Sequence, residues 1–308
     1  MTSDKYFPAL TGFRAIAAWL VFAHHYNPFS RTLFVSSVVD AGYIGVSMFF
    51  VLSGFLITVR YDSEQLSFGW YMQKRFARIY PLYFLLTTLT FFVAGEWGWI
   101  YIANITFIKG FSDELKFTGI SQGWSLTVEE TFYVLAPMVF LAIRKSKLAW
   151  FIPVALVLIC WNNFVLTYTF LGRSFDFFAG IFLAKAWQHK VAFKYFTWTG
   201  IAGLIVCLVF PQPFLVPVVT VALMYGLLNE RTWLHRLLST PPMQLFGKSS
   251  YAFYLVHIGV MALWLSKVIS SNPLVLFVLL NAVSIALYYT VERPLRQYFL
   301  PKNDRIKP

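Results

Sequence analysis

Long apolar runs, separated by short polar and basic segments, recur along almost the whole chain of 308 residues. Each run approaches the ~20 residues that a helix needs to cross a bilayer. Because a helix satisfies its own backbone hydrogen bonds in lipid, the pattern predicts an all-α, polytopic integral membrane protein. The ten predicted transmembrane helices are 10–27, 43–61, 78–94, 124–143, 149–168, 172–188, 196–210, 213–229, 249–269 and 273–291. The shorter apolar stretch 97–111 favours a re-entrant or interfacial segment.

The composition agrees with this pattern. Hydrophobic residues make up 58% of the chain and charged residues 12%, against about 25% charged residues in a typical soluble domain. A water-soluble domain and a disordered chain are both excluded, since each needs more polar side chains. We therefore expect a single transmembrane domain over 1–308, with no appended soluble domain. Two cysteines, both in apolar runs, indicate no metal site and no disulfide framework.

The positions of the charges explain the net charge of +12. Ten spans place both termini on the same side of the membrane, and 19 of the 25 Lys and Arg residues fall on that side. The positive-inside rule makes that side cytoplasmic. The positive charge thus indicates orientation in the membrane and gives no support for a nucleic-acid partner.

The first span holds ionisable residues, which are costly in a membrane and are candidates for function. Arg14 and His25 are eleven residues apart, so they lie within about 20° of the same helical face, with a rise of about 16 Å between them. Arg14 is expected near the cytoplasmic end and His25 near the outer end. In the alternative interpretation, Arg14 reaches the interface along its apolar stem and His25 is an interfacial anchor.

The fourth predicted span carries a carboxylate at a comparable depth. Ser125, Glu129 and Tyr133 recur at four-residue spacing and share a face. A carboxylate beside an imidazole orients it and raises its basicity, so Glu129 next to His25 would give a general base for a hydroxyl proton. A structural ion pair and a pair of acidic residues at a helix start remain alternatives.

Two guanidinium groups stand between the second and third spans. Arg75 and Arg78 are three residues apart on one helical face, an arrangement that suits a phosphate or pyrophosphate. An ordinary cytoplasmic basic cluster is the alternative. In the second span, Ser53 and neighbouring glycines form a small-residue face for close packing or for a passage.

The ninth predicted span places His257 near the middle of the membrane. Tyr254, three residues earlier, and Tyr251 could supply its hydrogen bonds. A structural polar network and a role in substrate binding both fit this pattern.

In this order, the motifs resemble acyltransferase family 3, the bacterial membrane-bound carbohydrate O-acyltransferases, over nearly the whole chain. The resemblance rests on Arg14 with His25, the segment Phe49–Phe55, Arg75 with Arg78, Trp124-Ser125-Leu126 with Glu129 and Phe132-Tyr133, Ser250-Tyr251 with Tyr254-Leu255 and His257, and Glu292-Arg293-Pro294.

The resemblance implies an enzyme of the bacterial inner membrane that uses cytoplasmic acyl-CoA, usually acetyl-CoA, as its donor. The acceptor would be a hydroxyl of a carbohydrate or glycolipid, such as O-antigen, exopolysaccharide or peptidoglycan. His25 would be the general base supported by Glu129, and Arg14, Arg75 and Arg78 would bind the donor. Membrane lipid is an expected partner, no metal is expected, and the oligomeric state is open.

Residues near the passage would support catalysis or line the route. The resemblance assigns this role to Ser53, Trp124, Tyr254 and His257. Two other functions remain open: a proton-coupled transporter of a small solute, for which mid-membrane histidines and carboxylates are also typical, and a nonenzymatic subunit of polysaccharide assembly.

Overall fold

The computed structural model describes residues 6–27, 33–62, 66–152, 168–189, 195–210, 212, 214–301 and 304, and every regular element in these ranges is helical. The chain divides into two compact units, one made of 1–62, 146–162 and 171–250, the other of 63–145, 163–170 and 251–308. Each is described by itself.

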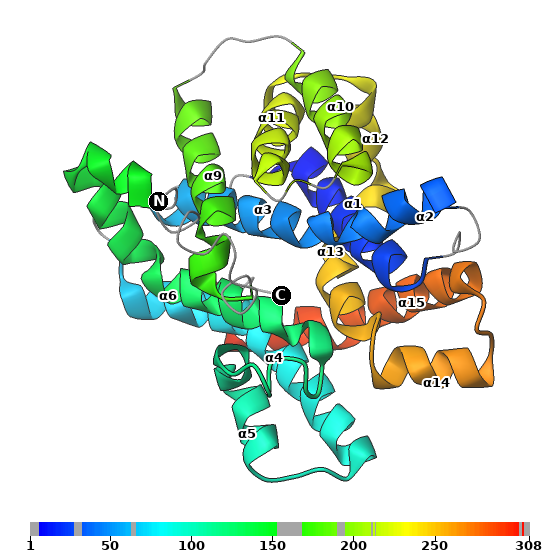
Figure 1. Cartoon of the computed structure of the whole chain (residues 1–308). Coiled ribbons are helices and arrows are strands. Elements are labelled where there is room, and N and C mark those ends of the chain that lie inside the picture. The colour runs from blue at the N-terminus through cyan, green and yellow to red at the C-terminus, as the bar shows by residue number, and fades with distance from the viewer. Residues whose placement is uncertain are drawn as a thin grey trace. The chain divides into compact units, whose positions relative to one another are not determined.

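The first unit contains the N-terminal helices. Its helices are α1 (Pro8–His25), α2 (Leu33–Asp40), η1 (Ala41–Tyr43), α3 (Ile44–Tyr61), η4 (Lys147–Phe151), α9 (Phe170–Gln188), α10 (Phe196–Val209), α11 (Leu215–Asn229), α12 (Trp233–Leu238) and the start of α13 (Pro241–Val256). Helices α10 and α11 lie side by side (Figure 1). Phe13, Val51, Phe55 and Met224 belong to one buried apolar core that joins α1, α3 and α11.

Small residues bring α3 and α9 close together. A Cβ at Gly54 would lie 2.2 Å from the carbonyl oxygen of Phe177, and a Cβ at Gly180 would lie 2.0 Å from that of Val51. The two backbones can approach this closely only because both positions lack a side chain, as is common between membrane helices. The predicted packing role of the small-residue face on the second span is therefore confirmed.

The second unit begins with the longest described helix. Its helices are α4 (Phe68–Ala94), α5 (Trp99–Ile105), η2 (Ile108–Phe111), η3 (Ser121–Gly123), α6 (Trp124–Lys145), the end of α13, α14 (Val260–Val268), α15 (Pro273–Leu287), the π-helical turn η5 (Tyr288–Glu292) and α16 (Arg293–Phe299). With seven residues, α5 is too short to cross a bilayer, in agreement with the prediction for 97–111.

Four described helices are long and apolar enough to cross a membrane: Val38–Tyr61, Phe68–Ala94, Ser121–Lys145 and Pro273–Phe299. The prediction of one continuous helix over 249–269 is wrong, because α13 and α14 meet at a bend of 88°. Gly259 lies in this break with a φ of 97°, which glycine adopts most readily. The predicted span 149–168 lies largely outside the described residues. The ten-span count and the cytoplasmic termini stay predictions.

Candidate functional site

The first unit carries Arg14 and His25 on one unbroken helix, α1. The predicted eleven-residue relation along a regular helix is therefore confirmed. Arg14 is partly buried, whereas His25 is exposed and is the last residue of the helix. The ring of His24 lies edge-on to that of His25, with 4.8 Å between the centroids. His25 is thus accessible at the end of α1.

A polar cluster that the sequence did not predict holds α2 against this helix end. The Nδ2 of Asn27 donates to Oδ1 of Asp40 and to Oγ of Ser36, each at 2.9 Å. The ring Nδ1 of His24 contacts the backbone carbonyl of Asp40. These contacts join His24 and Asn27, at the end of α1, to residues of α2 up to 16 positions later in the sequence.

Ser53 is partly buried on α3, the helix that also carries Ser47. The Nη1 of Arg173 on α9 donates to Oγ of Ser47 at 3.3 Å and lies 3.8 Å from the buried carboxylate of Asp176. The sequence analysis singled out neither Arg173 nor Asp176. Their three-residue spacing on one helix is the signal that could have found the pair.

In the second unit, Arg75 on α4 is buried, with 7% of its surface exposed. Its guanidinium faces the ring of Tyr133 on α6, 5.6 Å from the centroid. The hydroxyl of Tyr133 donates to a carboxylate oxygen of Glu129, and the hydroxyl of Tyr71 donates to the Tyr133 carbonyl at 3.0 Å. The predicted shared face of Glu129 and Tyr133 is confirmed.

This contact joins residues that the sequence argument assigned to different depths. The sequence argument placed Arg75 at the cytoplasmic mouth and Glu129 in the outer half of the membrane. In the structure, a single side chain, Tyr133, separates the guanidinium from the carboxylate. Glu130 also lies within electrostatic reach of Arg75. The long arginine side chain reaches α6 from α4, which the sequence of α4 alone does not show.

A second polar network surrounds the break between α13 and α14. The hydroxyls of Tyr254 and Ser125 are hydrogen-bonded at 2.7 Å. The Nε2 of Gln122 donates to the carbonyls of Tyr254 and Leu255, at 3.0 and 2.8 Å. Helices end with unsatisfied carbonyls, so this amide caps the broken end of α13.

His257 is fully buried at the same break, where its Nδ1 contacts the Tyr254 carbonyl at 2.7 Å. Tyr254 therefore supplies a hydrogen bond to His257, as predicted, through its backbone carbonyl. The hydroxyl of Tyr251 instead donates to the carbonyl of Ile79, at 2.7 Å. Trp124, at the start of α6, stacks edge-on with Tyr168 at 4.8 Å between centroids.

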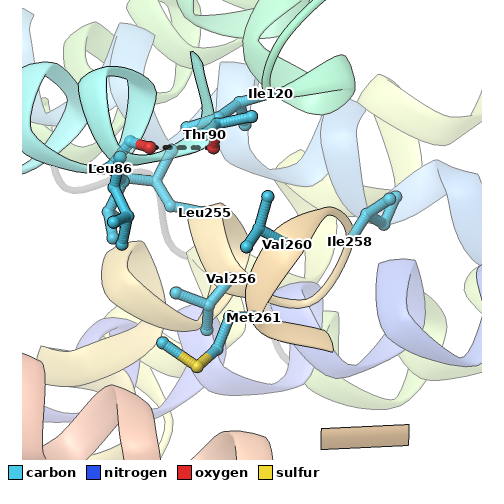
Figure 2. A pocket seen from close by; sticks show the side chains of 9 residues that line it. Leu86, Thr90, Ile120, Leu255, Val256, Ile258, Val260 and Met261 are labelled. Atoms are coloured by element: carbon cyan, nitrogen blue, oxygen red, sulfur yellow. Dashed lines mark hydrogen bonds between the residues drawn. The ribbon is translucent and has the colours of Figure 1, made fainter. Parts of the chain in front are cut away.

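A small apolar pocket of about 30 Å³ opens beside this network (Figure 2). Figure 2 shows Leu255 and Val256 from α13 and Val260 and Met261 from α14 lining it, with Leu86 of α4 nearby. A pocket of this volume holds about one or two water molecules, so it is far too small for a nucleotide or a sugar.

Lys109, between α5 and α6, has no exposed surface. Its Nζ donates to the carbonyls of Thr118 and Ile120, at 2.7 and 2.6 Å. Burial lowers the pKa of Lys109 to about 7. Sequence reasoning counted it only as an outer basic residue. Among the residues that the structure describes, no group of His, Cys, Asp and Glu is placed to hold a metal ion.

Together, the apolar spans, the buried arginine and the carboxylates on a spanning helix define a membrane protein with a polar interior. The family described as an acyltransferase domain matches residues 7–293, nearly the whole chain. The chain therefore belongs to this acyltransferase family, as its motifs predicted.

Curated relatives carry the same kind of name. Peptidoglycan O-acetyltransferase OatA of Listeria monocytogenes is 27% identical over 324 aligned residues, which cover 85% of this chain and 50% of the relative. YrhL of Bacillus subtilis, named provisionally as a peptidoglycan O-acetyltransferase, is 24% identical over 361 residues, with 95% and 55% covered. The chain spans about half the length of these relatives. No solved structure matches it significantly.

Proposed function

We propose that the protein transfers an acetyl group from cytoplasmic acetyl-CoA to a hydroxyl of a cell-envelope or exported carbohydrate. The observation that carries this proposal is the family match over residues 7–293, together with relatives named as O-acetyltransferases. Two of those relatives are named for peptidoglycan, which makes a cell-wall glycan the first acceptor to test. The proposed location is the bacterial inner membrane.

The donor is held by guanidinium groups. Arg75 and Arg78 lie one turn apart on α4, and planar guanidiniums bind phosphate oxygens through paired hydrogen bonds. Arg14, inside α1, is also assigned to the donor, and this assignment rests on the sequence alone. The extended pantetheine arm of CoA compares in length with the rise of about 16 Å between Arg14 and His25. The thioester could therefore reach His25 while the nucleotide stays at the cytoplasmic side.

In the proposed reaction, the imidazole of His25 takes the proton of the acceptor hydroxyl. The acceptor oxygen forms a bond to the thioester carbonyl carbon, and collapse of the tetrahedral intermediate breaks the C–S bond. The CoA sulfur leaves with the proton that the imidazolium returns. Glu129 supports His25 in this scheme, a pairing that rests on the sequence alone. In the structure, Tyr133 holds the Glu129 carboxylate.

The remaining predicted residues are assigned to support of the passage. The Ser125–Tyr254 hydrogen bond fixes the start of α6 against the end of α13, and the ring of Trp124 packs on that of Tyr168. His257 stabilises the bend that follows. Ser53 belongs to the small-residue helix α3.

The central test uses purified full-length protein in liposomes with acetyl-CoA and a glycan acceptor. His25→Ala should abolish release of free CoA that depends on the acceptor, whereas His189→Ala, at an exposed position after α9, should leave it intact. A folded His25→Ala variant with full transfer would refute the general-base assignment. If the wild type releases no CoA but moves a solute with protons, the transporter alternative holds instead.

A further inference from the structure

The C-terminal helix α16 runs antiparallel to the first half of α4. A carboxylate oxygen of Asp304 accepts a hydrogen bond from Nε1 of Trp70 at 2.7 Å and lies 3.6 Å from Nζ of Lys74. Asp304 lies beyond the end of α16. At the last residue of α16, the carbonyl of Phe299 accepts a hydrogen bond from Nε2 of Gln73 at 3.2 Å. Residues that come later in the C-terminal segment thus contact residues that come earlier in α4.

This order places Arg296 beside the arginine pair of α4. The rings of Phe299 and Phe76 lie 5.8 Å apart, and Arg296, three residues before Phe299, shares its helical face. Because the two helices run antiparallel, Arg296 lies toward the part of α4 that follows Phe76, and this part contains Arg78. Electrostatic interactions of Arg296 with Arg75 and Arg78 agree with this register.

A π-helical turn, η5, directly precedes α16. Such turns add a residue to the helix and are frequent at functional sites. The turn ends at Glu292, whose buried carboxylate interacts electrostatically with Arg296 and with Tyr251. Tyr251 in turn bonds to the carbonyl of Ile79 on α4. The turn therefore lies at the same part of α4 as the arginine pair.

Carboxylates lie among these guanidiniums. Glu130 lies in reach of Arg75, Glu292 lies in reach of Arg296, and Tyr133 joins Arg75 to the Glu129 carboxylate. Three guanidiniums are suited to a ligand with several phosphate groups, because each can bind phosphate oxygens through two parallel bonds.

We propose that Arg296 is a third phosphate-binding residue, which together with Arg75 and Arg78 holds the nucleotide part of the acyl-CoA donor. The nucleotide of CoA carries a pyrophosphate and a 3′-phosphate, hence three phosphate groups for three guanidiniums. This inference rests on the proposed acyl-CoA function and assigns a donor-binding role to the α16 segment.

Two donors distinguish phosphate binding from a structural role. Acetyl-CoA carries the nucleotide, whereas acetyl-pantetheine carries the thioester arm without any phosphate. Arg296→Gln should raise the KM for acetyl-CoA about tenfold or more, the loss typical of a charged hydrogen bond, with kcat within about twofold. Its KM for acetyl-pantetheine should be unchanged. Arg296→Lys, which keeps the charge without the planar fork, should fall between the two.

The matched control is Arg144→Gln, which removes an exposed arginine from the last turn of α6. It should leave both KM values unchanged. If Arg296→Gln raises the KM for acetyl-CoA and for acetyl-pantetheine equally, Arg296 has a structural role and the inference is wrong. The inference is also wrong if the KM of Arg296→Gln for acetyl-CoA equals that of Arg144→Gln.

Binding of free CoA, measured by thermal shift of the purified protein, separates this inference from the proposed reaction. CoA should stabilise the wild type and Arg144→Gln but fail to stabilise Arg296→Gln at the same concentration. If CoA binds in this pattern while no acetyl transfer occurs, the reaction is wrong and the phosphate site stands. If the wild type binds no CoA, the phosphate site is wrong as well.

Discussion

Replacing the buried Lys109 by methionine should remove a pH dependence of stability. Burial lowers the pKa of Lys109 from 10.5 to about 7 in the folded protein. Between these two values the unfolded chain binds a proton at this site and the folded protein does not. Stability therefore rises with pH across this window, and well below pH 7 the contribution of Lys109 to stability no longer changes with pH.

The size follows from the pKa difference. A shift of this extent makes protonated Lys109 destabilising by up to about 5 kcal/mol at low pH. With these pKa values, the penalty falls by about 2 kcal/mol between pH 7 and pH 9. Between pH 7 and pH 9, the free energy of unfolding of the wild type should therefore rise by this amount relative to that of Lys109→Met, in which no proton binds at position 109.

Equilibrium unfolding in detergent at pH 7 and pH 9 measures the effect as the stability difference between the two proteins. Other titrating groups are common to both and cancel. Lys267→Met, which removes an exposed lysine from the last turn of α14, is the control and should show the wild-type pH dependence. A difference between wild type and Lys109→Met that stays constant from pH 7 to pH 9 would refute the reasoning.

Three further substitutions test packing, capping and the support of Glu129. Gly180→Ala would place a Cβ 2.0 Å from the Val51 carbonyl oxygen and should abolish a monodisperse peak in size-exclusion chromatography. Gly69→Ala, with no atom within 4 Å of the added Cβ, should not. Gln122→Leu removes the donor to two carbonyls at the end of α13 and should cost about 1–3 kcal/mol in detergent unfolding; an unchanged midpoint would contradict the capping role. Tyr133→Phe loses the bond to Glu129 but keeps the ring that faces Arg75, so kcat should fall about tenfold with KM for acetyl-CoA unchanged. A raised KM for acetyl-CoA with an unchanged kcat would contradict the assignment of Tyr133 to the support of Glu129.

The placement of Arg75 has a consequence for the proposed enzyme. Because Tyr133 contacts both this guanidinium and the Glu129 carboxylate, it links a donor-binding residue to a residue of the proposed catalytic pair.

Local pattern alone determined much about this protein. The apolar runs predicted helices, and the glycine-containing face of 43–61 predicted close packing, which Gly54 confirms. The relation of Glu129 to Tyr133 followed from helical spacing, since residues four apart share a face. The family was also readable from ordered motifs. All these features depend on residues close together in sequence or on a regular helical period.

Only the tertiary structure decided the break in α13–α14 and the residues that stabilise it. Gln122 bonds to carbonyls more than 130 positions away, and no local pattern specifies such a contact. The same holds for Arg75 on the ring of Tyr133 and for Arg296 beside α4. Helical periodicity gives the direction of a side chain around its own axis. Which helix that side chain meets depends on how distant segments pack. Local sequence patterns therefore could not predict these contacts between helices.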